Sequence, residues 1–555
     1  MSIATELTRI QQAKEDIKEA LISKGCPVLS SETIDDYVKY INMMGEYHDY
    51  SQDYLTFIAK ETGTFTLTIG SAVTTSVLTS ISYSTDDGET WTTTNNANDA
   101  TVTITTPTVN KGNKVLWKGT GVGVSTTTNN SNRPSTSSIF SSTGTFDVEG
   151  NILSLVWGDN FVGKDYVAEG SSYNFALLFY EQNMPEYAKV VSAKNMCMPI
   201  KNVPTCCYFR MFQASTGATA NSVLVEAPSK IGVESVGASA CTSMFYACTL
   251  LTAVPSLPAT TLAEGCYGFM FQRCESLTSI PNGLLPATTL ARMCYRSMFS
   301  MCTGLTSIPS DLLPATTLTD WCYPWMFEFC SSLTNVPSDL LPATTLTERC
   351  YYGMFSECAS LATVPSDLLP ATTLAHSCYA GMFYHCTSLT TAPELPATTL
   401  GVNCYESMFD GCTSLTTAPE LPATTLAMDC YQHMFNGCTS LTVAPPTLPA
   451  LTVPSGSSSS YGCYQRMFSG CTSLTSSPII SATTIGEKGM SEMFRGCTNL
   501  SNITCLATDI SATNCTENWV TNVAASGTFT KAASMSSWTT GANGIPANWT
   551  VVDAT

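Results

Sequence analysis

Apolar residues recur at a fixed spacing through the second half of the chain. Between residues 205 and 505 a Met-Phe pair returns, mostly at intervals of 26 or 28 residues, as in Met298-Phe299. With Cys294 numbered 0, cysteine also stands at position 8, methionine at 4, phenylalanine at 5 and leucine at 11. A fixed period in this range indicates a solenoid, in which stacked coils share one core.

The spacing within a copy predicts how each coil is built. Positions 0, 4, 5 and 8 fall on one face of a helix, so we expect a short helix that points its Cys, Met and Phe side chains inward. Proline lacks an N–H, so a residue such as Pro419 suits the end of the extended piece that follows. The recurring Pro-Ala-Thr-Thr-Leu segment then returns the chain to the next helix.

A different pattern covers residues 51–204. Segments such as "TFTLTI" and "ATVTITT" alternate apolar and polar residues with a period of two and are rich in threonine, valine and aromatic residues. Turn residues such as Asp87-Gly88 separate them. We expect an antiparallel β-sandwich-like domain or a pair of small β modules.

The first 50 residues predict helix. A heptad pattern runs through Ile3, Leu7, Ile10, Ile17 and Leu21. It fits either a helical hairpin packed on its own domain or an oligomerisation and attachment segment, with a trimer favoured. Residues 506–555 lack the repeat and are expected to cap the solenoid. The predicted fold class is therefore multidomain α+β: a helical segment, a β-sandwich-like domain and a leucine-rich-repeat-like solenoid.

Most of the 25 cysteines occupy positions 0 and 8 of the repeat. Two positions eight residues apart on a helix are roughly 12 Å apart, whereas a disulfide needs Cα atoms within about 7 Å. Pairing within a coil is thus disfavoured, while pairing between neighbouring coils remains geometrically open. The sequence holds no Cys-x-x-Cys pair that would favour a zinc site. We expect reduced, buried thiols and neither metal nor cofactor.

The charge balance narrows the choice of partners. The formal net charge is −19, only 12% of residues are charged, and lysine and arginine form no cluster. Phosphate binding needs such a cluster, so a nucleic-acid partner is not expected. No run of apolar residues is long enough to span a membrane, so membrane insertion is not expected. The polar first twenty residues do not resemble a secretory signal, and we expect synthesis in a cytosol.

The segment "MFDGCTSLTTAPELPATTL", from Met408, carries a family resemblance. It resembles the BspA-type leucine-rich repeats, or bacterial surface-protein repeats, over residues 205–505. That resemblance implies surface recognition or adhesion and offers no catalytic residue. Residues 1–45 resemble N-terminal segments of structural proteins of tailed phages that infect gut bacteria.

One short motif suggests chemistry. A motif at residues 84–91 resembles the Asp-box, a hairpin motif of sialidases. It consists of Ser84, Asp86, Gly88 and Trp91. It occurs once, and Arg133 is the sole arginine between residues 50 and 205, although a sialidase needs several arginines to bind a carboxylate. We interpret the motif as a structural turn. His376, His385 and His433 stand at positions that vary among copies, so we expect them to face solvent.

Recognition is expected where the copies differ. Positions 3 and 7 vary most in chemistry, and several copies carry large apolar residues there or nearby. The candidate recognition surface is Phe269, Met301, Trp321, Trp325, Phe329, Tyr352 and Tyr384. Exposed apolar patches often mark interfaces. The alternatives are packing against residues 150–205 and contact with another subunit.

These patterns predict a non-enzymatic structural protein of a phage virion, of the fibre, head-fibre or decoration type. Its N-terminal segment would bind other virion proteins, as a homotrimer, and its solenoid would bind a bacterial surface protein or glycan. The alternative is a leucine-rich-repeat adhesin on a bacterial cell surface.

Overall fold

The computed structural model divides into two units, Met1–Asp53 and Tyr54–Thr555. It describes Gln11, Lys14 and Lys18 and residues 48–69, 78–95, 102–121, 125–128, 134–167, 171–180, 187–215, 222–232, 234–456, 462–536 and 538–555. The predicted heptad of Ile3, Leu7, Ile10, Ile17 and Leu21 lies outside these residues, so its role stays a prediction. In the first unit, the 3-10 helix η1 (Tyr50–Gln52) begins after Asp49, whose side chain accepts a hydrogen bond from the Ser51 N–H at 3.1 Å.

The second unit begins with two facing sheets and a hairpin. The larger sheet has the order β11 (Val190–Cys197), β10 (Phe146–Asn151), β1 (Leu55–Ala59), β6 (Lys114–Gly121), β3 (Leu78–Ser84) and β4 (Thr92–Asn95). The smaller sheet has the order β5 (Val102–Thr105), β2 (Phe65–Ile69) and β9 (Ile139–Ser142), and the hairpin pairs β7 (Ser125–Thr128) with β8 (Pro134–Ser137). The short helix α3 (Ser154–Trp157) and the 3-10 helix η2 (Gly158–Asn160) follow β10.

Alternation of side chains explains how the sheets meet. Along β2, Phe65, Leu67 and Ile69 are buried, whereas the two intervening threonines are partly exposed. Phe57 of β1 lies between the sheets, with its ring centroid 4.8 Å from that of Phe140 and 5.6 Å from that of Trp117. Apolar residues of period two therefore build one aromatic core between the two layers.

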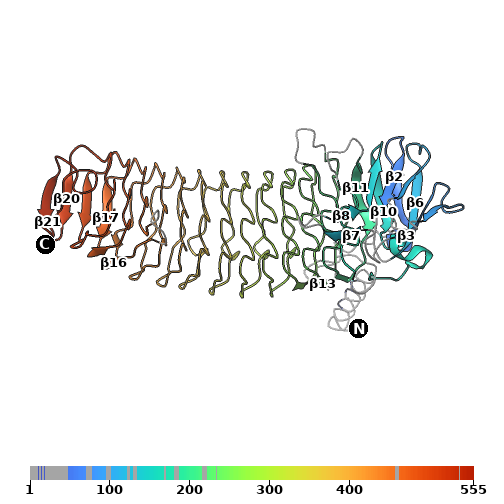
Figure 1. Cartoon of the computed structure of the whole chain (residues 1–555), viewed down its shortest axis with the longest axis horizontal. Coiled ribbons are helices and arrows are strands. Elements are labelled where there is room, and N and C mark those ends of the chain that lie inside the picture. Colours follow the sequence, from blue (N-terminus) through green and yellow to red (C-terminus); the bar gives the residue numbers. More distant parts are fainter. Residues whose placement is uncertain are drawn as a thin grey trace, which may run out of the picture. The chain divides into compact units, whose positions relative to one another are not determined.

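This core continues without a break into the solenoid. The Phe140 ring stacks on Phe179 at 5.5 Å, and Phe179 stacks on Phe212 at 5.1 Å. On the outside, β11 runs parallel to β10 and then bridges to the first coils through Ser192 and Glu226. Figure 1 shows β11 and β10 beside the first coils. The β sheets thus close one end of the solenoid's apolar core.

The Cys-Met-Phe part of each coil is a run of tight turns, which we call the turn wall: positions −1 to 8, residues 265–274 in one coil. Every fourth residue of this wall has a left-handed backbone, as at Gly265 (φ 62°), Phe269 (φ 58°) and Arg273 (φ 64°). The predicted short helix is therefore wrong, because a helix cannot contain left-handed residues at this interval.

Hydrogen bonds on the turn wall alternate between two directions. The N–H of Met270 donates to Tyr267 O, three residues back in the same coil, at 3.2 Å. The N–H of its neighbour Phe269 donates instead to Arg296 O of the next coil, at 2.8 Å. Even positions thus close turns and odd positions join coils, which satisfies the buried backbone groups without a helix or a regular strand.

The remaining sides of each coil are extended and pair only locally. The first coils are joined by the parallel strands β12 (Asn202–Val203), β13 (Ser235–Val236) and β14 (Thr261–Leu262). In later coils single parallel bridges suffice, as between Thr317 and Thr345 in the Ala-Thr-Thr segments. The coils stack in register, as the repeat predicts (Figure 1).

Two aromatic columns fill the centre of the stack. Position 5 stacks phenylalanines from Phe179 to Phe494 with adjacent centroids 5.1–5.8 Å apart. Position 1 stacks tyrosines from Tyr267 to Tyr464 at 5.7–6.1 Å. These rings, with Met at position 4, bury most of the apolar area that stabilises the stack.

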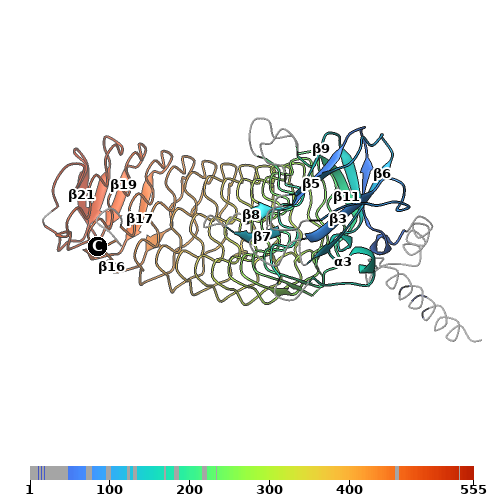
Figure 2. The same ribbon diagram turned by 45° about the vertical axis from the view of Figure 1, so that its right-hand side comes forward.

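The last part of the chain continues the stack. Residues 447–553 add a parallel sheet of β15 (Thr447–Leu448), β17 (Ser476–Ile480), β19 (Asn502–Cys505), β20 (Thr528–Lys531) and β21 (Thr550–Asp553), and a pair of β16 (Thr452–Val453) with β18 (Thr484–Ile485). Trp519 covers the end of the phenylalanine column, 6.1 Å from Phe494, and Trp538 stacks on it at 5.5 Å. Figure 2 shows β17, β19 and β21 at the end opposite β3 and β6.

The predicted α+β fold class is wrong. Among the residues that the structure describes, strands and turns predominate, and the sole α-helix with assigned bounds is the four-residue α3. The helical part of the prediction came from the first 50 residues and from the spacing of positions 0, 4, 5 and 8. The turn wall reproduces that spacing without any helix.

Candidate functional site

The turn wall carries a cluster of aromatic and arginine side chains. The Trp325 ring lies 5.0 Å from the Tyr352 ring, nearly perpendicular to it, and 6.1 Å from Trp321. The guanidinium carbon of Arg296 lies 5.1 Å from the Phe269 centroid and 5.2 Å from the Trp325 centroid. Arg349 lies 4.6 Å from the Trp321 centroid. We call these six residues the arginine–aromatic cluster: Phe269, Arg296, Trp321, Trp325, Arg349 and Tyr352.

Four of the seven residues predicted for recognition belong to this cluster: Phe269, Trp321, Trp325 and Tyr352. Met301 and Phe329 occupy position 7 of adjacent coils; Met301 is half-buried and Phe329 is 38% exposed. Tyr384 stacks instead on its neighbour His385, at 4.1 Å. The described part of residues 150–205 leaves the Phe329 side chain exposed, and both alternatives for the surface stay open.

The prediction missed the two arginines of the cluster. Arg296 stands at position 2 and Arg349 at position −1, and the comparison of copies considered positions 3 and 7. The missing signal was chemical. An arginine at the same position as a large aromatic residue of a neighbouring coil, or one position away from it, forms a cation–π contact when coils stack in register. Position 2 of one coil lies beside position 3 of the coils on either side.

The Asp-box is a self-contained turn. Ser84 Oγ donates to Asp86 Oδ1 at 2.6 Å, and the Thr90 N–H donates to the same oxygen at 2.9 Å. The hydroxyl hydrogen bonds hold the pKa of Asp86 at about 2, Ser84 contributing most. Gly88 takes the left-handed backbone (φ 89°) that the turn requires. The Asp86 carboxylate is therefore occupied by its own hairpin, which agrees with a structural role.

The thiols form two buried columns. At position 8, the Cys302 thiol donates to Phe271 O of the preceding coil at 3.2 Å, and the equivalent cysteines repeat this bond. Burial raises the pKa of Cys302 to about 12. At position 0, Cys430 Sγ and Cys463 Sγ lie 3.1 Å apart. Every cysteine in the described part of the chain has a free thiol.

Histidines and carboxylates gather further along the turn wall. His385 Nδ1 lies 3.2 Å from Glu357, and His376 Nδ1 lies 3.5 Å from Glu348. These two histidines keep about 40% of their side-chain area exposed, whereas burial lowers the pKa of His433. The expected exposure to solvent thus holds only in part. Within the described ranges, no group of three or more His, Cys, Asp or Glu is placed to hold a metal ion.

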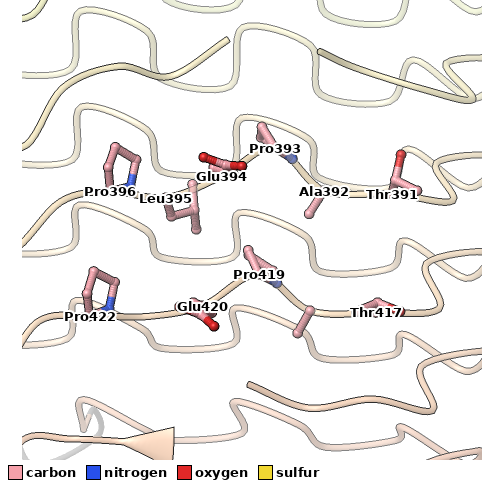
Figure 3. A pocket seen from close by; sticks show the side chains of 11 residues that line it. Thr391, Ala392, Pro393, Glu394, Leu395, Pro396, Thr417, Pro419, Glu420 and Pro422 are labelled. Atoms are coloured by element: carbon pink, nitrogen blue, oxygen red, sulfur yellow. The ribbon is translucent and has the colours of Figure 1, made fainter. Parts of the chain in front are cut away.

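A hollow of about 550 Å³ lies on another side of the stack, between two adjacent coils. Pro393, Glu394 and Pro396 line it from one coil, and Pro419 and Glu420 line it from the next. Figure 3 shows these residues in register, with each proline and glutamate repeated one coil further on. The hollow coincides with a change in coil length, because these two coils have "PELP" where the preceding ones have "PSDLLP".

A second hollow, of about 590 Å³, lies on the β-sheet end beside Trp157, Asp159 and Lys164. The Lys164 ammonium lies 5.1 Å from the Trp157 ring, so the aromatic face is partly covered. No helix of the described chain combines the length and apolar character needed to cross a bilayer.

Comparison with known proteins gives one structural likeness. No protein-family model matches the chain, and no curated protein matches it. It is similar to a leucine-rich repeat protein from Bacteroides ovatus ATCC 8483, with 19% sequence identity, over 61% of this chain and 90% of that one. The TM-score is 0.30, which is too low for an argument about function.

Proposed function

We propose that this repeat protein is a non-catalytic binding protein whose turn wall attaches to polysaccharide on a bacterial surface. The observation that carries the proposal is the arginine–aromatic cluster. The Trp325 ring lies 6.1 Å from Trp321 of its own coil and 5.0 Å from Tyr352 of the next coil. Aromatic and arginine residues are the side chains most enriched at binding hot spots.

The backbone beneath the cluster supports this role. Trp321, Trp325 and Phe329 all stand at left-handed positions, where the N–H of each residue donates a hydrogen bond to a carbonyl of the next coil. Ligand binding therefore requires little ordering of the protein, and a preorganised surface loses less entropy on association. A wall that repeats once per coil also matches a ligand with a chemical repeat, such as a polysaccharide.

Binding to an array of purified bacterial capsular and lipopolysaccharide glycans tests the proposal. The full chain should bind at least one glycan, and Trp325→Ala combined with Phe329→Ala should weaken that binding about tenfold or more. Val443→Ala is the matched control, because Val443 is also an exposed apolar side chain, at 52%, and stands outside the turn wall. No binding by the full chain, or equal binding by the folded double variant, would overturn the proposal.

The place of action remains the one that the sequence predicts. We propose a phage virion, with the first 50 residues attaching a homotrimer to other virion proteins; a bacterial cell surface is the alternative. Imaging of the native assembly would locate the protein on a particle or on a cell. Mass determination of the full chain in solution tests the trimer, and a monomer would contradict the attachment role of residues 1–50.

A further inference from the structure

Arg296 differs in its partners from Arg292 and Arg466, two other arginines of the turn wall. Arg292 pairs with Glu264 at 2.8 Å, and Arg466 pairs with Glu492 at 3.0 Å. In the part of the chain that the structure describes, no carboxylate lies at ion-pairing distance from Arg296, and its Nε is buried without a hydrogen-bond acceptor. Arg296 as a whole is only partly buried, so its terminal N–H groups can donate to an anion that a ligand supplies.

The rings of Phe269 and Trp325 hold this guanidinium between them, at 5.1 and 5.2 Å from its central carbon. The group thus contacts one aromatic ring from each of the two neighbouring coils. The planar guanidinium presents parallel N–H groups that match a carboxylate in bidentate geometry. The two ring contacts therefore restrict the conformations of the Arg296 side chain before binding, which favours binding of a planar anion.

The surroundings favour an anion that also has an apolar face. Burial and the nearby charge of Arg292 lower the pKa of Arg296, so a negative charge beside it is stabilising. Tyr352 lies on the far side of Trp325, and its ring, with that of Trp321, extends the aromatic surface away from Arg296. A sugar that bears a carboxylate combines the two features, since its C–H face packs on a ring while its acid reaches the arginine.

We infer that Arg296 binds the carboxylate of an acidic sugar in a polysaccharide, with Trp325 and Tyr352 packing on the sugar ring. The inference rests on the proposed function and deepens it by naming the ligand class. It distinguishes uronic-acid polymers from neutral polysaccharides, which lack the anion. A sulfated polymer, whose oxygens can also accept from the guanidinium fork, is the competing ligand that the experiment separates from them.

Binding of the full chain to three soluble polymers tests this assignment: polygalacturonate, dextran sulfate and dextran, measured by biolayer interferometry at several salt concentrations. We expect polygalacturonate to bind most tightly, and its affinity to fall as salt rises because the contact is ionic. Arg296→Gln should reduce that affinity about tenfold or more, the value of one lost charge-assisted pair. Equal binding of dextran, or tighter binding of dextran sulfate, would overturn the carboxylate assignment.

Two further variants separate binding from folding. Arg466→Gln removes an arginine of the same wall that already has a carboxylate partner, so polygalacturonate affinity should stay unchanged. Arg296→Lys keeps the charge but not the fork, and should bind with intermediate affinity while its thermal unfolding matches that of the wild type. If Arg296→Lys and Arg296→Gln both bind polygalacturonate like the wild type, the inference fails.

The two proposals fail in different ways. Loss of glycan-array binding in the Trp325→Ala and Phe329→Ala double variant, with Arg296→Gln unaffected, would keep the binding function and remove the acidic-sugar assignment. Absence of any array binding together with Arg296-dependent binding of polygalacturonate would keep the anion site and remove the bacterial glycan as its target.

Discussion

The indole of Trp325 lies against Gly353 of the next coil, so close that a Cβ on Gly353 would stand 2.7 Å from Trp325 Cδ1. Both residues occupy position 3 and both have left-handed backbones. The large side chain of one coil therefore needs a small residue in the coil that follows. Two coils earlier, Phe269 is likewise followed at position 3 by a small residue, the buried Ser297.

Gly353→Ala should displace the Trp325 ring and weaken ligand binding. The left-handed backbone alone costs a residue with a Cβ about 1–2 kcal/mol, and the clash with the indole adds to that. Gly283→Ala is the control, because Gly283 is also left-handed (φ 65°) but has nothing within 4 Å of the added Cβ. Urea denaturation should show a larger loss for Gly353→Ala; equal losses would contradict the packing of Trp325 on Gly353.

Phe327→Ala should open the phenylalanine column in the middle of the stack. Phe327 is fully buried between Phe299 and Phe355, with centroids 5.8 Å away on each side. Loss of a buried phenylalanine costs about 3–5 kcal/mol, and in a repeat protein the loss is felt by neighbouring coils first. Hydrogen exchange should rise in coils 294–378, whereas Phe329→Ala, at an exposed position of the same coil, should leave exchange unchanged.

The position-8 thiols should resist alkylation in the native protein. A thiolate is the reactive form, and burial raises the pKa of Cys302 to about 12, so the thiolate is negligible at pH 8. Iodoacetamide followed by peptide mass spectrometry should label Cys302 only after denaturation. Cys197 is partly exposed and serves as the internal control, with labelling in the native state. Rapid native labelling of Cys302 would show that the stack opens readily.

Because of Asp410, the free energy of unfolding should fall as the pH rises. Burial raises the pKa of its carboxyl, while a hydrogen bond from Asn436 at 2.9 Å opposes the shift. A carboxyl with a raised folded pKa is protonated more readily in the folded state, so its contribution is favourable at low pH and is lost between its ordinary value of 3.8 and the raised one.

Asp410→Asn should therefore flatten the dependence of the melting temperature on pH and raise it at pH 7. Asp509→Asn is the contrasting control, because hydrogen bonds from Ser511 lower the pKa of the exposed Asp509. A variant Asp410→Asn that melts with the same pH profile as the wild type would contradict a titrating Asp410.

The sequence was sufficient to predict which positions of a coil are buried, but not their backbone. Cys294, Met298, Phe299 and Cys302 are all 0% exposed, as the spacing predicts. The interval 0, 4, 5, 8 fits both a helix of 3.6 residues per turn and a wall of four-residue turns. The distinguishing signal was present at position 7, where glycine recurs in successive coils, since glycine favours a left-handed backbone: Gly411, Gly437, Gly470 and Gly496.

The aromatic residues of the site could be predicted from the sequence, but Arg296 could not. Variation among copies identified Phe269 and Trp325, because their size departs from that of the residues at position 3 in other coils. Arg296 contacts those rings only because coils stack in register, at 5.1 and 5.2 Å. Residues 269, 296 and 325 are far apart in the sequence. Their contact could not be predicted because it depends on the direction in which each side chain points in the stack.

The alternating hydrogen bonds of the turn wall carry a consequence for how such a protein changes over generations. Each coil offers the same carbonyl acceptors to the coil before it, and the N–H groups at its odd positions donate to the carbonyls of the coil that follows. Duplication or deletion of one whole unit in the gene would thus lengthen or shorten the molecule by one layer while every remaining bond finds an equivalent partner. The length of the solenoid can then evolve separately from the side chains that any single coil exposes.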